Sequence, residues 1–107
     1  MISIFNFKEY ISEEMRNKAT QYLLGGNIIQ MAEDDDGCYD ALFHEGSKEE
    51  WGEVTLDRDN NIEDYCCPFC GVNFCVHVAA MCYGAQLMMS KGTRDLAKAM
   101  DKNNNKI

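Results

Sequence analysis

The sequence predicts an α+β fold: an N-terminal helix, a four-stranded antiparallel meander, a cysteine-rich turn, then one long and one short C-terminal helix. Apolar residues at helical spacing end at a Gly-Gly pair at 25–26. Alternating apolar and polar residues, separated by turn signals, then occupy 28–66. A chain of 107 residues fits one domain, which we place at residues 1–101, with a disordered tail at 102–107.

The first helix is predicted from Ser12 to about Leu24. Ser12 can cap it, and Glu13 and Glu14 lie in its first turn, where the helix dipole favours negative charge. Its apolar stripe contains Met15, Ala19, Tyr22 and Leu23, and Phe7 and Ile11 begin the same packing face one turn earlier.

Four short strands are predicted at 28–33, 38–43, 51–56 and 62–66. An Asp-Gly pair at 36–37 is a strong hairpin signal between the first two. Residues 44–48 and 57–61 form the other turns. In the third strand we take Trp51, Val54 and Leu56 as the apolar members. Such short connections favour a meander.

A long helix is predicted over 76–89 because its residues are apolar nearly all round, which indicates burial. Gly92 ends this helix. Thr93 is expected to cap a last helix that runs through Met100.

The segment that carries most chemical information lies between residues 67 and 77. Its Cys-Pro-Phe-Cys-Gly run at 67–71 has the form of a zinc knuckle, in which Pro68 presets φ and Gly71 permits a positive φ. Zn²⁺ takes four sulfur or nitrogen ligands tetrahedrally, and a site filled by protein has no open position for substrate. We therefore predict one structural Zn²⁺ per chain, held by Cys67, Cys70, Cys75 and His77.

The remaining cysteines are assigned by geometry and spacing. Neighbouring residues on a strand point to opposite faces, so Cys67, the partner of Cys70, faces the metal and Cys66 becomes a free thiol on the other face or in the core. Cys38 and Cys82 lack ligand spacing and are expected in the core. A cluster of buried thiols or a set of disulfides is the alternative to a metal site.

Neither an N-terminal export signal nor a membrane-spanning segment is evident in the sequence. The apolar start, Met1–Phe5, is too short for a signal-peptide core, and no run of about 18 apolar residues could span a bilayer. We therefore expect a cytoplasmic protein whose cysteines are metal ligands or reduced thiols.

The net charge of −8 is unevenly distributed. Residues 33–64 contain thirteen acids against Lys48 and Arg58, whereas residues 65–107 carry a charge of +3. The acidic middle is either a solvated surface or a surface for a basic protein partner, and it should repel nucleic acid.

The segments at 51–62 and 67–81, and above all Cys75-Val-His-Val-Ala-Ala80, resemble a SWIM-type zinc finger. Residues 22–28 resemble the segment that leads into such fingers in bacterial Swi/Snf-type helicase-like ATPases. The resemblance implies a C-x-C…C-x-H ligand set, binding to DNA or protein, and no catalytic residues. Tyr65 stands where the family has its first cysteine, and either Cys70 or Cys66 could replace it. Without an ATPase after it, the finger would be a freestanding module.

No P-loop, dinucleotide fingerprint or Ser-His-Asp set is evident, so we do not expect an enzyme. A nucleophile–base pair of Cys66 or Cys38 with His44 is the remaining catalytic alternative. The favoured function is a zinc-stabilised, non-catalytic interaction or regulatory module with an acidic surface for a basic protein. The alternatives are a nucleic-acid-binding finger and an acidic, nucleic-acid-mimicking inhibitor encoded by a phage or mobile element.

Overall fold

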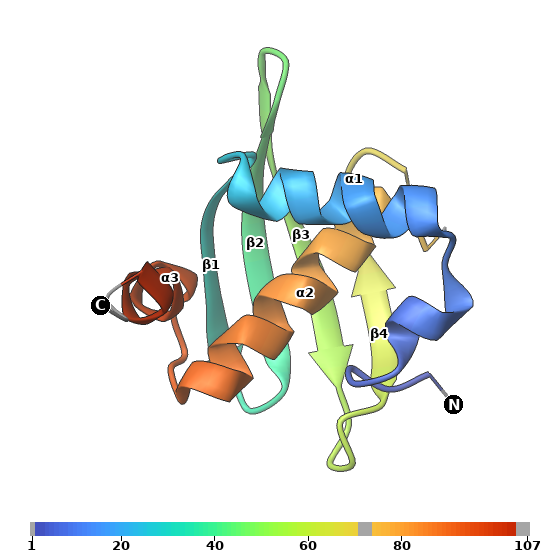
Figure 1. Ribbon diagram of the computed structural model, residues 1–107, viewed down its shortest axis with the longest axis vertical. Helices are drawn as coiled ribbons and strands as arrows, with labels where there is room; N and C mark the ends of the chain where they lie inside the picture. Colours follow the sequence, from blue (N-terminus) through green and yellow to red (C-terminus); the bar gives the residue numbers. More distant parts are fainter. Residues whose placement is uncertain (1, 71–73, 105–107) are drawn as a thin grey trace.

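The computed structural model describes residues 2–70 and 74–104, with side chains up to Asp101, and it has the predicted α+β fold (Figure 1). Helices α1 (Glu13–Leu24) and α2 (Val76–Lys91) cover one face of a four-stranded sheet. A short 3₁₀ helix, η1 (Phe7–Tyr10), precedes them, and α3 (Leu96–Asn104) packs against α2 and the first strand.

The sheet is an antiparallel meander in the order β1-β2-β3-β4, as predicted. Its strands are β1 (Ile28–Asp35), β2 (Cys38–Glu45), β3 (Lys48–Leu56) and β4 (Ile62–Cys66). The predicted 44–48 loop is wrong in extent, because β2 continues through Glu45 and β3 already begins at Lys48. The turn tightens to two residues, and Gly46 adopts φ +64, which glycine tolerates without steric cost.

The helix ends follow local hydrogen bonding. Ser12 accepts a hydrogen bond from the Met15 amide and caps α1, and Gly92, with φ +66, ends α2. The predicted cap of α3 is wrong: the Asp95 carboxylate, not Thr93, accepts the bond from the Lys98 amide at 3.2 Å. This helix also runs past Met100 to Asn104, into the segment predicted as a tail, and 105–107 lie outside the described residues.

The hydrophobic core lies between the sheet and the helices. The buried side chains of β1, β2 and β3 face those of α2; among them are Met31, Tyr39, Phe43, Val54, Val78, Met81 and Met88. Two glycines mark where the layers approach most closely. A Cβ on Gly84 would lie 2.7 Å from Met31 Sδ, and one on Gly52 would lie 3.1 Å from Met81 Cε.

Among the described residues, no helix is long and apolar enough to cross a membrane.

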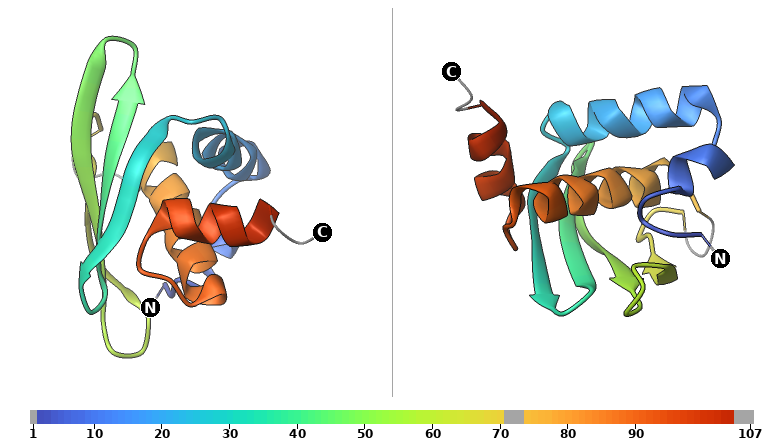
Figure 2. Two further views of the ribbon diagram at one scale, coloured as in Figure 1. Left: turned by 90° about the vertical axis from the view of Figure 1, so that its left-hand side faces the viewer. Right: turned by 60° about the horizontal axis from the view of Figure 1, so that its bottom comes forward.

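No helix within residues 2–70 and 74–104 covers the other face of the sheet (Figure 2). Its residues alternate with the core positions of the same strands. Trp51 lies on this outer face and is 52 % exposed, whereas Val54 and Leu56, the other apolar members predicted for this strand, are buried. The reason is the period of two in a strand, which puts Gly52, Val54 and Leu56 on one side and Trp51 on the other.

Candidate metal centre

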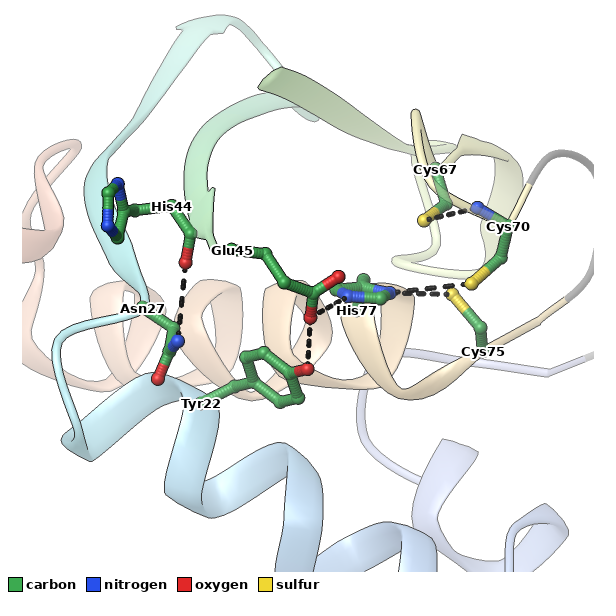
Figure 3. A network of polar contacts seen from close by, with 8 residues as sticks. All are labelled: Tyr22, Asn27, His44, Glu45, Cys67, Cys70, Cys75 and His77. Atoms are coloured by element: carbon green, nitrogen blue, oxygen red, sulfur yellow. Dashed lines mark hydrogen bonds and ion pairs between the residues drawn. The ribbon is translucent and has the colours of Figure 1, made fainter. Parts of the chain in front are cut away.

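The structure brings together the four residues predicted as zinc ligands. The thiol sulfurs of Cys67, Cys70 and Cys75 and a ring nitrogen of His77 all lie within 4.8 Å of one another (Figure 3). Cys67 directly follows β4, Cys75 is the N-cap of α2, and His77 is in the first turn of that helix. The sheet and the longest helix thus each deliver part of the set.

The local geometry of the cluster fits a tetrahedral ion. His77 Nδ1 lies 3.5 Å from Cys70 Sγ and 3.6 Å from Cys75 Sγ. Bonds of about 2.3 Å to sulfur and about 2.0–2.1 Å to nitrogen, at tetrahedral angles, separate S and N by about 3.6 Å. The Cys70 amide also donates to Cys67 Sγ at 3.3 Å, as expected for a turn folded around a thiolate. The predicted role of Gly71 falls outside the described residues.

The other ring nitrogen of His77 is held by Glu45. Glu45 Oε1 lies 3.0 Å from His77 Nε2, and the same oxygen accepts a hydrogen bond from the Tyr22 hydroxyl. These two bonds lower the pKa of Glu45, so the carboxylate stays ionised and fixes the imidazole proton on Nε2. Nδ1 is then a free lone pair that faces the thiols, which is the arrangement that metal-binding histidines require.

Sequence reasoning missed Glu45 and Tyr22, which come from β2 and α1. The available signal was the alternation of Tyr39, Ala41 and Phe43, which places Glu45 on the helix-facing side once the strand is extended. Predicting a loop at 44–48 hid that signal.

Aromatic rings enclose the imidazole. The ring of His77 is 4.9 Å from Phe69, 5.1 Å from Tyr22 and 5.4 Å from Phe43, between ring centroids. His77 is 4 % exposed, and Cys67 is buried as well, whereas Cys70 is exposed. The apolar surroundings strengthen each electrostatic contact to the imidazole because water is excluded.

The thiols of the cluster differ in acidity. Burial raises the pKa of Cys67 to about 12. Burial also opposes ionisation of Cys75, but two hydrogen bonds outweigh it in the metal-free protein and lower its pKa to about 6. One comes from the Val78 amide, and the other from His77 when its imidazole is protonated on Nδ1 as well as on Nε2. Without a metal, Cys75 is therefore the first of these thiols to become the thiolate that a metal needs.

The structure also locates the residues whose roles the sequence left open. Cys66 is exposed on the outer face, paired with Glu53 across the β3–β4 ladder, and so points away from the cluster. Tyr65 faces the helices and packs against Phe74 at 5.2 Å. Cys82 is fully buried in α2, as predicted. All six cysteines are free thiols.

The prediction that Cys38 is a core residue is wrong. It is half-buried on the outer face, where its Sγ lies 3.8 Å from a Glu53 carboxylate oxygen. With Asp40 these residues form a second group whose potential ligand atoms lie within 4.8 Å of one another. This group contains one thiol and two carboxylates and no imidazole, so its donors suit zinc less well than those of the buried cluster.

The suggested nucleophile–base pairs are not assembled. Cys38 and His44 are six residues apart on β2, which separates them by about 20 Å along the strand. His44 instead pairs with Glu49 at 3.4 Å. Cys66 is paired with Glu53 of β3, whereas His44 is paired with Glu49, which lies four residues earlier on the same strand. Cys66 and His44 are therefore not neighbours on the sheet.

Comparison with known proteins gives no relative from which a function could be transferred. No protein-family profile, no curated protein and no solved structure matches this chain.

Proposed function

We propose that this protein is a zinc-stabilised, non-catalytic interaction module that presents an acidic surface to a basic protein partner. The observation that carries the zinc proposal is the cluster of three thiols and one imidazole, with S···N separations of 3.5 and 3.6 Å. Four protein ligands leave no open coordination position, so the ion would be structural.

In this proposal the centre is arranged as in a SWIM-type finger. The Cys75-x-His77 pair at the start of α2 supports that arrangement. Cys70 takes the role of the cysteine that the family has at the position of Tyr65. Cys66 is not a candidate for that role, because it is exposed on the opposite face.

The acidic surface supports the choice of partner. Thirteen acids lie in residues 33–64, and two of them, Glu33 and Asp36, are paired with Arg94 at 3.3 and 3.1 Å. Arg94 is therefore engaged within the fold rather than presented to phosphate. Binding of nucleic acid needs several free lysines or arginines on one surface.

The zinc proposal is tested by elemental analysis of protein purified without added metal. We expect about one equivalent of zinc in the wild type and less than about half in Cys75→Ala, because a site with three ligands holds the ion poorly. Cys66→Ser is the matched control and keeps its zinc. Loss of zinc in Cys66→Ser and its retention in Cys70→Ser would show that the assigned ligand set is wrong.

The partner proposal is tested with short duplex DNA at physiological salt. We expect dissociation constants of about 10⁻⁴ M or weaker, since like charges repel. Sub-micromolar binding of DNA or RNA would replace this proposal by a nucleic-acid-binding finger. If the protein instead displaces DNA from a basic DNA-binding protein, the acidic mimic is the better description.

A further inference from the structure

The uncovered face of the sheet contains a hollow of about 400 Å³. It is lined by residues of three adjacent strands: Gln30, Ala32, Asp34, Asp40 and Trp51. Its volume is in the range of small-ligand sites. In the side view of Figure 2, the helices of the described part of the chain all lie on the opposite side of the sheet.

Strand register explains how the hollow is built. Asp40 on β2 is opposite Ala32 on β1, and Leu42 on β2 is opposite Trp51 on β3. Trp51 and Asp40 are therefore diagonal neighbours on one face, at a spacing that an aromatic side chain can bridge. The small side chain of Ala32 leaves the floor of the hollow open beside them.

The outward-facing positions of the four strands contain carboxylates and no lysine or arginine. By strand register these acids are Asp35, Asp40, Glu49, Glu53 and Asp64. Asp34, at the bulge of β1, lines the hollow as well. Among the residues that the structure describes, no basic side chain forms an ion pair with Asp34 or Asp40. Two unneutralised carboxylates thus line a hollow whose wall is a half-exposed indole.

We propose that this hollow binds an arginine side chain of the protein partner. The guanidinium stacks on the face of Trp51 and donates hydrogen bonds to Asp34 and Asp40. Arginine fits better than lysine because its planar group can stack and hydrogen-bond at the same time. The inference rests on the proposed function, since it names the chemistry by which a basic partner is recognised.

Two other occupants fit the hollow less well. An apolar ligand would bury two carboxylates without a partner, which costs free energy. A phosphate backbone would face the outward carboxylates and would meet no lysine or arginine at the outward-facing positions of the strands.

The experiment uses the zinc-loaded chain and a hexa-arginine peptide. Trp51 is the only tryptophan in the chain, so one indole N–H resonance reports on the hollow without overlap. We expect a saturable shift of this resonance, and binding about tenfold weaker in Asp34→Asn/Asp40→Asn and in Trp51→Ala, measured by calorimetry. Trp51→Phe keeps an aromatic ring, so it should lose less affinity for the peptide than Trp51→Ala.

The controls distinguish a specific site for arginine from general attraction between opposite charges. Asp59→Asn removes an exposed charge in the β3–β4 turn and should change affinity less than twofold. Hexa-lysine should bind several-fold more weakly than hexa-arginine. Equal binding of the two peptides, or equal loss in Asp59→Asn and Asp40→Asn, overturns the proposal.

Zinc content is measured in each variant. A protein that contains zinc but gives no Trp51 shift refutes this inference alone. A zinc-free protein with the shift intact refutes the metal proposal alone.

Discussion

The two faces of the sheet are built by the same four strands but carry different chemistry. On β2, Phe43 is 1 % exposed and contacts the ring of His77, while its neighbour Leu42 lies beside Trp51 on the outer face. Glu45 faces the cluster of cysteines and His77, whereas His44 pairs with Glu49 on the outer face. Strand β2 therefore supplies core packing and contacts to His77 on one side and charged surface on the other.

Stability and recognition can therefore be separated residue by residue along one strand. Substitutions on the outer face change the charge that a partner meets without removing core contacts. Substitutions on the inner face act on the packing and the metal centre together, because Phe43 and Glu45 contact the same imidazole.

Removal of zinc should have the largest effect, and it should be confined to the inner side. Structural zinc contributes on the order of 10 kcal/mol of apparent free energy in small modules, which is comparable to the stability of a whole domain. We expect a strong chelator to loosen at least residues 62–90, measured by hydrogen exchange and thermal unfolding. An unchanged melting temperature after verified zinc removal would contradict a structural role.

Truncation of neighbouring residues on β2 should have unequal effects. Phe43→Ala removes a buried ring and should cost about 3–5 kcal/mol in the free energy of unfolding. Leu42→Ala, on the outer face, should cost about 1 kcal/mol or less. Denaturant unfolding of the zinc-loaded variants measures both. Equal costs would show that the two faces do not differ in their contribution to stability.

Local patterns were sufficient to predict the order of elements, the meander and the four clustered side chains. The ligands lie within residues 67–77, so their spacing is visible in the sequence. Tyr22 and Glu45 could not be found this way, because they meet His77 across 55 and 32 residues of chain. Strand alternation puts Trp51 on the face opposite to Val54 and Leu56, and the structure has it there.

Glu45→Gln should weaken zinc binding by about 10–100-fold, because it removes the charged partner that orients His77. Glu49→Gln makes the same change on the same hairpin but contacts His44 on the outer face. Competition with a chelator of known affinity measures both variants. A weaker affinity in Glu49→Gln as well would indicate that total charge, rather than the contact to His77, controls the metal.

The smallest predicted effect concerns alkaline stability. Burial raises the pKa of Tyr39 from 10.0 to about 12. Above pH 10 the unfolded chain loses this proton and the folded chain keeps it, so stability falls as pH rises through this window. Tyr39→Phe cannot ionise there, and its stability should fall less steeply between pH 10 and pH 12 in denaturant titrations. Parallel profiles of stability against pH for the wild type and Tyr39→Phe would contradict the raised pKa of Tyr39.

The short span of the ligand set also has a consequence for folding kinetics. All four candidate ligands lie in an eleven-residue segment, so capture of an ion would close only small loops, whose entropic cost is low. The contacts of His77 with Glu45 and Tyr22 require closure of much longer stretches of chain. We therefore expect the nascent turn to capture zinc before the sheet is complete. Docking of the β2–β3 hairpin and α1 would then be the later, slower step that secures the ion.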